Sequence, residues 1–206
     1  MEFVLKHHQF EKLRENPFFE DTICPSDLES QSLIQEMMKQ IRALHPMSTT
    51  IHIGSDEAYH IAEDMRCGIA LREKFDNSTD DLKLSHISKV ARFAREQLNF
   101  SRVLAWNDMF DKISSEKLNK HKLGDWLTPV VWGYIVDVTV PGYFPDGMFD
   151  RYEKVFSRWM YAGAFKGANG IDQIFMNATR YFLNVESYVR LHSQISEVSD
   201  YGTINH

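Results

Sequence analysis

Four short apolar runs recur along this chain of 206 residues, separated by longer stretches of which several have helical spacing. The runs are Thr50–Gly54, Arg102–Trp106, Pro129–Tyr134 and Arg158–Phe165. Each is too short for a buried helix of usual length, and the second and third are rich in residues that favour strands. Strands that alternate with helices predict an α/β fold with a parallel sheet. A doubly wound sheet and a (β/α)₈ barrel share this alternation, so the pattern leaves both open.

Helical spacing is clearest in two stretches. Ser26, with Glu29 three residues later, forms a capping-box pattern, and apolar residues then recur at three- and four-residue intervals to Leu44. A second helix is expected from Leu84 to about Leu98. Shorter candidate helices cover Ile61–Phe75, Phe149–Phe156 and Ile171–Phe182. We therefore expect a single domain over residues 1–206 whose segment 184–206 is a polar C-terminal tail.

Composition excludes several classes of protein. The net charge of −6 disfavours a nucleic-acid binder, which needs a basic face. No apolar stretch is long enough for a membrane span, and the N-terminus lacks the pattern of a signal peptide. Two cysteines, Cys24 and Cys67, are too few for a disulfide framework and fit a reducing compartment, so a cytoplasmic location is expected, with the nucleus as a second site. The glycine-rich segment 163–170 matches neither nucleotide-binding motif, so no cofactor is expected.

The sharpest local feature is an acid pair, Asp56-Glu57, that follows the first apolar run through Gly54 and Ser55. Functional residues in α/β proteins gather at the carboxyl ends of strands. Two carboxyl groups held close together there can keep different protonation states, so that one donates a proton while the other stays charged. Neighbouring strand residues point to opposite faces, so the two can converge only if the backbone turns at Gly54 and Ser55.

Two other interpretations of the acid pair remain open. Asp56 and Glu57 could simply cap the following helix, where acids are favoured by the helix dipole. His52 and His60 flank the pair and suggest a metal site, but the matching second motif of a bundle di-metal site is missing, so no metal is predicted.

Aromatic residues end the next two strands. Trp106 is followed by Asn107 and Asp108, and Trp132 precedes Tyr134 by two positions. An apolar ring beside hydrogen-bonding groups is what a sugar site requires, although either tryptophan alone could belong to the core.

Four segments together resemble glycoside hydrolase family 20: Met1–His7, His52–Glu57, Trp106–Met109 and Ala164–Ala168. The resemblance extends from residue 1 to about 183. It implies a catalytic TIM (β/α)₈ barrel and an enzyme that removes terminal β-linked N-acetylhexosamines. It also implies that the four strands here are about the fourth to seventh of that barrel, with their helices.

The resemblance also implies a mechanism and a set of site residues. The substrate's own 2-acetamido oxygen attacks the anomeric carbon, an exception to the two-carboxylate scheme of most glycosidases. Glu57 is the implied general acid and base, and Asp56 orients and stabilises the acetamido group. Trp106 and Trp132 are the implied pocket walls, with polar contacts from Tyr134 and Asp108.

This chain departs from the family pattern in ways that leave a second function open. Asn107 and Gly133 stand where relatives carry Asp, and the family's first three strands and its last strand have no counterpart here. The implied partner is a glycan that contains N-acetylglucosamine or N-acetylgalactosamine. The alternative is a non-catalytic remnant that binds sugar weakly or associates with another chain through open sheet edges.

Overall fold

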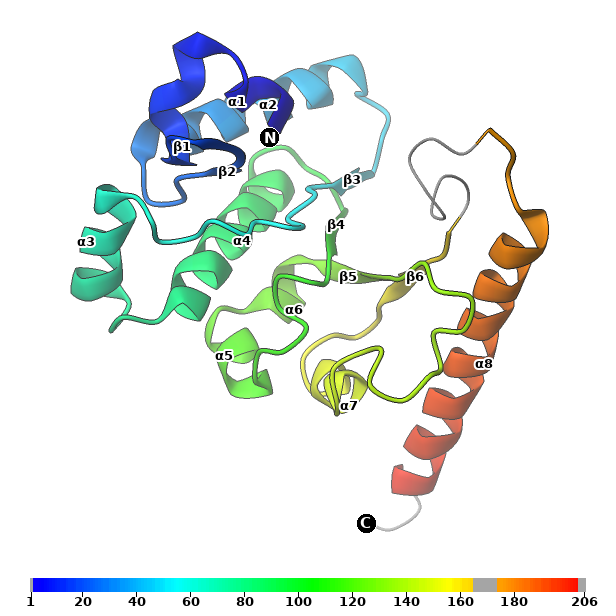
Figure 1. The fold of residues 1–206 in the computed structure, drawn as a ribbon. Helices are drawn as coiled ribbons and strands as arrows, with labels where there is room; N and C mark the ends of the chain where they lie inside the picture. Colours follow the sequence, from blue (N-terminus) through cyan, green and yellow to red (C-terminus); the bar gives the residue numbers. More distant parts are fainter. Residues whose placement is uncertain (1, 165–173, 204–206) are drawn as a thin grey trace.

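The computed structural model describes residues 2–164 and 174–203, and its centre is a parallel four-stranded sheet (Figure 1). The strand order is β3-β4-β5-β6, and every neighbouring pair is parallel. The strands are β3 (Thr50–His52), β4 (Arg102–Trp106), β5 (Thr128–Trp132) and β6 (Met160–Ala162). Each lies within or overlaps one of the four predicted runs, so the α/β class and the parallel sheet are confirmed.

Helices fill most of the connections between these strands. They are α3 (Met65–Lys74), α4 (Thr79–Glu96), α5 (Ser115–Lys120), α6 (Leu123–Trp126) and α7 (Met148–Glu153), while α2 (Leu28–Leu44) precedes β3 and α8 (Ala178–Thr203) follows β6. The N-terminal segment adds α1 (Glu2–Leu5), the 3₁₀ helix η1 (His8–Leu13) and an antiparallel pair of strands, β1 (Arg14–Asn16) and β2 (Phe19–Ile23). This N-terminal segment was not predicted from the sequence.

The main core lies between the sheet and the helices that cover one face of it. Val103 and Ala105 of β4 and Val131 of β5 are buried there against Leu84 and Ile87 of α4. Because side chains alternate along a strand, the residues between them project from the opposite face. The strand registers place His52, Leu104, Trp106, Val130 and Trp132 on that second face.

Helix boundaries differ from the sequence prediction at the N-terminal ends. Helix α2 is capped by Asp27, whose carboxylate accepts from the Ser30 amide, and not by Ser26 as the capping-box pattern suggested. Helix α4 begins at Thr79, five positions before the expected Leu84, because the Ser78 hydroxyl caps it. In both cases a side-chain oxygen that meets a free backbone N–H fixes the start, and apolar spacing does not reveal that oxygen.

Much of the segment expected to be a polar tail is helical. Helix α8 continues to Thr203, and Tyr188 and Leu191 of this helix form a small buried cluster with Val138. Asn184 is fully buried and donates to the Gly133 carbonyl, which follows β5. The glycine-rich segment 163–170, the Ala164–Ala168 motif and the start of the predicted helix 171–182 fall largely outside the described residues.

Among the described helices, none is long and apolar enough to cross a bilayer. Within the described chain, the outer strands β3 and β6 each have one neighbour in the sheet. These are the two edges at which the sequence prediction places contact with another chain.

Candidate active site

The acid pair lies in an irregular segment that leaves the carboxyl end of β3. Gly54, Ser55 and Glu57 have φ angles of 73°, 68° and 48°, in the left-handed region. This conformation costs a residue with a side chain about 1–2 kcal/mol, and such strain concentrates at functional sites. The backbone therefore turns at Gly54 and Ser55, as the sequence argument required.

Asp108 joins the acid-bearing segment to the end of β5. Its Oδ2 accepts from the Glu57 backbone N–H at 2.8 Å, and its Oδ1 accepts from the Trp132 indole Nε1–H at 3.0 Å. One carboxylate thus fixes the position of the Glu57 backbone relative to the Trp132 ring. Hydrogen bonds to a charged acceptor are stronger than neutral ones, so this bridge is a strong local restraint.

Glu57, Asp108 and Trp132 line a common cavity of about 520 Å³. A cavity of this size is in the range of small-molecule sites. Its other lining residues are Tyr59, Asp80, Lys83, Met109, Asp111, Lys112 and Ile113.

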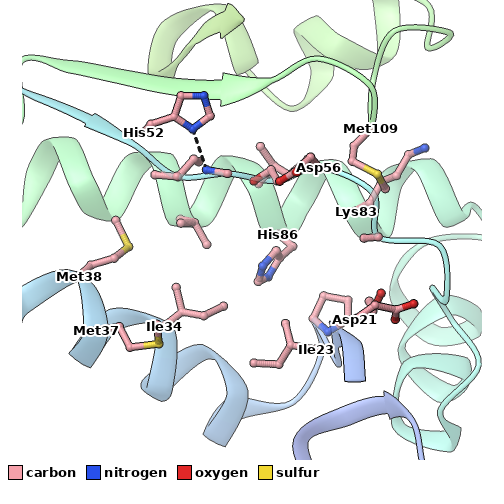
Figure 2. Close-up of a pocket in the computed structure, with 18 of the residues that line it drawn as sticks. Asp21, Ile23, Ile34, Met37, Met38, His52, Asp56, Lys83, His86 and Met109 are labelled. Carbon is pink, nitrogen blue, oxygen red and sulfur yellow. Dashed lines mark hydrogen bonds between the residues drawn. The ribbon is translucent and has the colours of Figure 1, made fainter. Parts of the chain in front are cut away.

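Asp56 lies in a different, adjoining cavity of about 410 Å³ (Figure 2). Figure 2 shows its side chain near Met109 and Lys83, and both of these residues line the two cavities. Asp56 stands between two left-handed residues, so the successive side chains leave the backbone in different directions. The two carboxylates therefore line adjoining cavities that share Lys83 and Met109, and the charges of both act on Tyr59 and Tyr134.

The second cavity is mainly apolar. Its walls come from α2, β2, β3 and α4, and His86 of α4 points toward its centre (Figure 2). Burial lowers the pKa of His86 to about 4, with a further contribution from Lys89. At neutral pH this imidazole is uncharged, which suits its apolar surroundings.

The three aromatic residues expected at the site do not all meet. The Trp132 and Tyr134 rings lie 5.2 Å apart, so these two form one aromatic wall. Trp106 lies against His52, with 4.5 Å between the ring centres, and is not among the residues that line the Glu57 cavity. Both tryptophans are half-buried on the sheet face opposite α4, and neither belongs to the main core.

Electrostatic coupling links the acids to two tyrosines. Burial, followed by the negative charges of Asp56 and Glu57, raises the pKa of Tyr134. The hydrogen bond to the Glu57 carboxylate is the main cause that raises the pKa of Tyr59. Both hydroxyls therefore stay protonated at neutral pH, as hydrogen-bond donors beside the acid pair.

The flanking histidines have other partners. The His60 ring lies 2.7 Å from the Asp21 carboxylate and stacks on Phe19, and the His52 Nδ1 accepts from the Gly54 amide. In the described part of the chain, three potential metal ligands come together elsewhere. They are Glu15, Cys24 and Cys67, whose ligand atoms lie within 4.8 Å of one another.

Two supporting residues were not predicted from the sequence. Asn107 is buried and accepts from the Trp132 backbone N–H at 3.3 Å, and Tyr59 lines the cavity beside Glu57. The sequence offered only one signal for each, namely adjacency to Trp106 or to the acid pair. Gly133 fits the packing, because a Cβ there would lie 2.6 Å from the Tyr143 hydroxyl oxygen and the Tyr143 side chain would have to shift.

The cavity can bind a polar ligand that has an apolar face. Trp132 offers a ring for stacking and has Tyr134 beside it, Asp108 and Tyr59 offer hydrogen-bonding groups, and Glu57 brings a carboxyl group to the same cavity. A positioned carboxyl group is the usual minimum for general acid–base chemistry.

Comparison with known proteins gives a family model and two curated relatives. Residues 4–135 match the family model described as "Glycosyl hydrolase family 20, catalytic domain". Two curated relatives, both named hexosaminidase D, come from Bos taurus and Homo sapiens. The first is 32% identical over 97% of this chain and 55% of its own length. The second is 34% identical over 98% of this chain and 40% of its own length, so this chain spans about half the length of the curated relatives it matches.

A solved structure is more distantly similar. It is an exo-β-N-acetylglucosaminidase from Vibrio harveyi in complex with N-acetylglucosamine. The match covers 87% of this chain and 37% of that one, with 14% identity and a TM-score of 0.42, a likeness too loose to define the fold.

Proposed function

This chain belongs to glycosyl hydrolase family 20, and from that premise we propose that it hydrolyses terminal, non-reducing β-linked N-acetylhexosamine residues. The substrate class rests on the family and on the two curated relatives, both of which are named hexosaminidase D. We place the reaction in the cavity that Glu57, Asp108 and Trp132 line.

Glu57 is the proposed general acid. It protonates the glycosidic oxygen as the bond to the anomeric carbon breaks, and its carboxylate then takes a proton from the incoming water. The hydrogen bond between the Glu57 amide and Asp108 supports this role, because it holds the segment that carries the acid.

Asp56 is the proposed partner of the substrate's acetamido group. The acetamido oxygen attacks the anomeric carbon, and the ring that forms carries positive charge near the acetamido nitrogen. A carboxylate that accepts the acetamido N–H orients this nucleophile and stabilises that charge. The proposal requires the Asp56 side chain to swing from its own cavity into the adjoining one, and Lys83 and Met109 line the boundary that it would cross.

The aromatic residues would hold the sugar. Trp132 offers an indole face with its Nε1–H already engaged by Asp108, and Tyr134 lies beside it as a candidate donor to the acetamido oxygen. Trp106 would complete the wall from β4, the neighbouring strand in the sheet.

The observation that carries the proposal is the bridge of Asp108 between Glu57 and Trp132. It ties the proposed acid to the proposed sugar platform, although the two residues are far apart in the sequence.

A second function is favoured by a different observation. The two acids line separate cavities, and both outer strands have a free edge in the described chain. A non-catalytic protein that binds an amino sugar, or that associates with another chain along β3 or β6, would need no convergence of Asp56 with Glu57.

Turnover separates the two candidates. The purified chain is incubated with aryl β-N-acetylglucosaminide and aryl β-N-acetylgalactosaminide, beside Glu57→Gln and a surface control, Glu73→Gln. Release of the aryl alcohol by the wild-type chain and by Glu73→Gln, but not by Glu57→Gln, supports the hydrolase. No turnover from a chain that melts cooperatively supports the non-catalytic protein, and light scattering then tests for self-association.

A further inference from the structure

Two buried thiols lie in contact outside the two cavities that the acid pair lines. The sulfur atoms of Cys24 and Cys67 are 2.7 Å apart, and both residues are fully buried. They are the only two cysteines of the sequence, and 43 positions separate them. With Leu82 they form a small hydrophobic cluster that is separate from the main core.

The cysteine pair joins two parts of the fold that otherwise meet through polar contacts. Cys24 directly follows β2, and Cys67 lies in the first turn of α3. The same two regions are bridged by Asn16 with Glu63 and by the Asp64 amide with Glu15. A covalent bond between the sulfurs would therefore reinforce an existing contact between these two regions.

Glu15 shapes the chemistry of this pair. Its side chain is fully buried, its Oε2 has no hydrogen-bond partner among the described residues, and one of its carboxylate oxygens lies within 4.8 Å of both sulfurs. The contact with Cys67, burial and the negative charge of Glu15 all raise the pKa of the Cys24 thiol. Since the thiolate is the reactive form, the carboxylate slows oxidation of the pair.

We infer that Cys24 and Cys67 are a reversible disulfide site that ties β2 to α3 when the chain meets a peroxide. The first sulfur attacks hydrogen peroxide, the O–O bond breaks, and a sulfenic acid and one water form. The second sulfur attacks the sulfenic sulfur, the S–S bond forms, the S–O bond breaks, and a second water leaves. Two thiols and one peroxide thus give one disulfide and two waters.

The spacing of the sulfurs favours a disulfide over a metal ion. Tetrahedral zinc holds two thiolates at about 2.3 Å, which places their sulfurs about 3.8 Å apart. The observed 2.7 Å is much nearer to the bonded distance of about 2.05 Å. A bound cation would therefore have to push the two side chains apart.

The test uses the whole chain, first reduced and freed of metal, and then treated with hydrogen peroxide. A disulfide lowers the intact mass by two hydrogen atoms and joins the Cys24 and Cys67 peptides in a non-reducing digest. Closing a loop of this length is expected to raise the melting temperature by roughly 10 °C, and a reductant should reverse the rise. This comparison uses one chain in two redox states, so it does not depend on how a variant folds.

Two variants and a control sharpen the test. Cys67→Ala should show neither the mass loss nor the rise in melting temperature. Glu15→Gln should form the disulfide severalfold faster than wild type, whereas Glu20→Gln on the same strand pair should match wild type. Three results would each overturn the inference. The thiols stay free in peroxide, the disulfide forms only between chains, or zinc binds both thiols and leaves them unoxidised.

Discussion

Replacement of Asp108 by alanine should release the acid-bearing segment from the aromatic wall. Asp108 accepts one hydrogen bond from the Glu57 amide and one from the Trp132 indole. A hydrogen bond to a charged group contributes about 1.5–3 kcal/mol, and the half-buried position of Asp108 favours the lower end of that range. A loss of about 1.4 kcal/mol corresponds to a factor of ten in a local opening equilibrium.

Hydrogen exchange measures this opening at the two donors. In Asp108→Ala, we expect the Glu57 amide and the Trp132 indole N–H to exchange about tenfold faster than in wild type. Asp111→Ala is the matched control, because Asp111 lines the same cavity without a described hydrogen bond to either donor. Unchanged exchange at both donors in Asp108→Ala, or equal acceleration in Asp111→Ala, would refute the role assigned to the bridge.

The remaining predictions concern stability. Gly133→Ala should lower the free energy of unfolding by about 1–3 kcal/mol in a denaturant titration, since its Cβ meets the Tyr143 hydroxyl, whereas Gly68→Ala within α3 should raise it by about 0.5–1 kcal/mol. Burial alone would raise the pKa of Asp81, but hydrogen bonds, the strongest from Lys120, outweigh burial and lower that pKa. Its stabilising contribution is therefore complete above about pH 4 and lost as the pH falls further. Thermal melts of Asp81→Asn should show a melting temperature that falls less steeply below about pH 4 than that of wild type. An equally steep fall would contradict this assignment.

The sheet was predictable because strand patterning in this chain is strong and local. β4 was predicted with its observed bounds, Arg102–Trp106, since this run is rich in residues that favour strands. β3 and β6 are both shorter than their predicted runs, and β3 ends where the backbone turns at Gly54 and Ser55. Turn geometry of this kind depends on tertiary contacts, and the sequence pattern does not contain them.

Helix starts and the C-terminal segment were harder to predict for a related reason. The Asp27 and Ser78 caps depend on which side-chain oxygen reaches a free amide. Helix α8 depends on Asn184 and Tyr188, which pack and bond against the Gly133 region about fifty positions earlier. A polar residue that becomes buried through a distant backbone carbonyl looks, in the sequence, like any other polar residue.

In the candidate site, the proximity of three predicted residues followed from the sheet, whereas the direction of each acid did not. Glu57, Asp108 and Trp132 share a cavity, as the carboxyl ends of adjacent parallel strands imply. Asp56 lies apart because left-handed residues stand on both sides of it. Alternation along a strand gives no information once the strand has ended, so the direction of each acid could not be derived from spacing.

The joint action of Asp56 and Glu57 on one acetamido sugar is tested most directly by calorimetry with a stable thiazoline analogue of the cyclised intermediate. An analogue of this kind should bind more tightly than substrate, because catalysis depends on complementarity to the transition state. We predict measurable binding to the wild-type chain, at least about tenfold weaker binding to Asp56→Asn, and unchanged binding to Glu73→Gln. Equal affinity for wild type and Asp56→Asn, or no binding to a folded wild-type chain, would contradict the account.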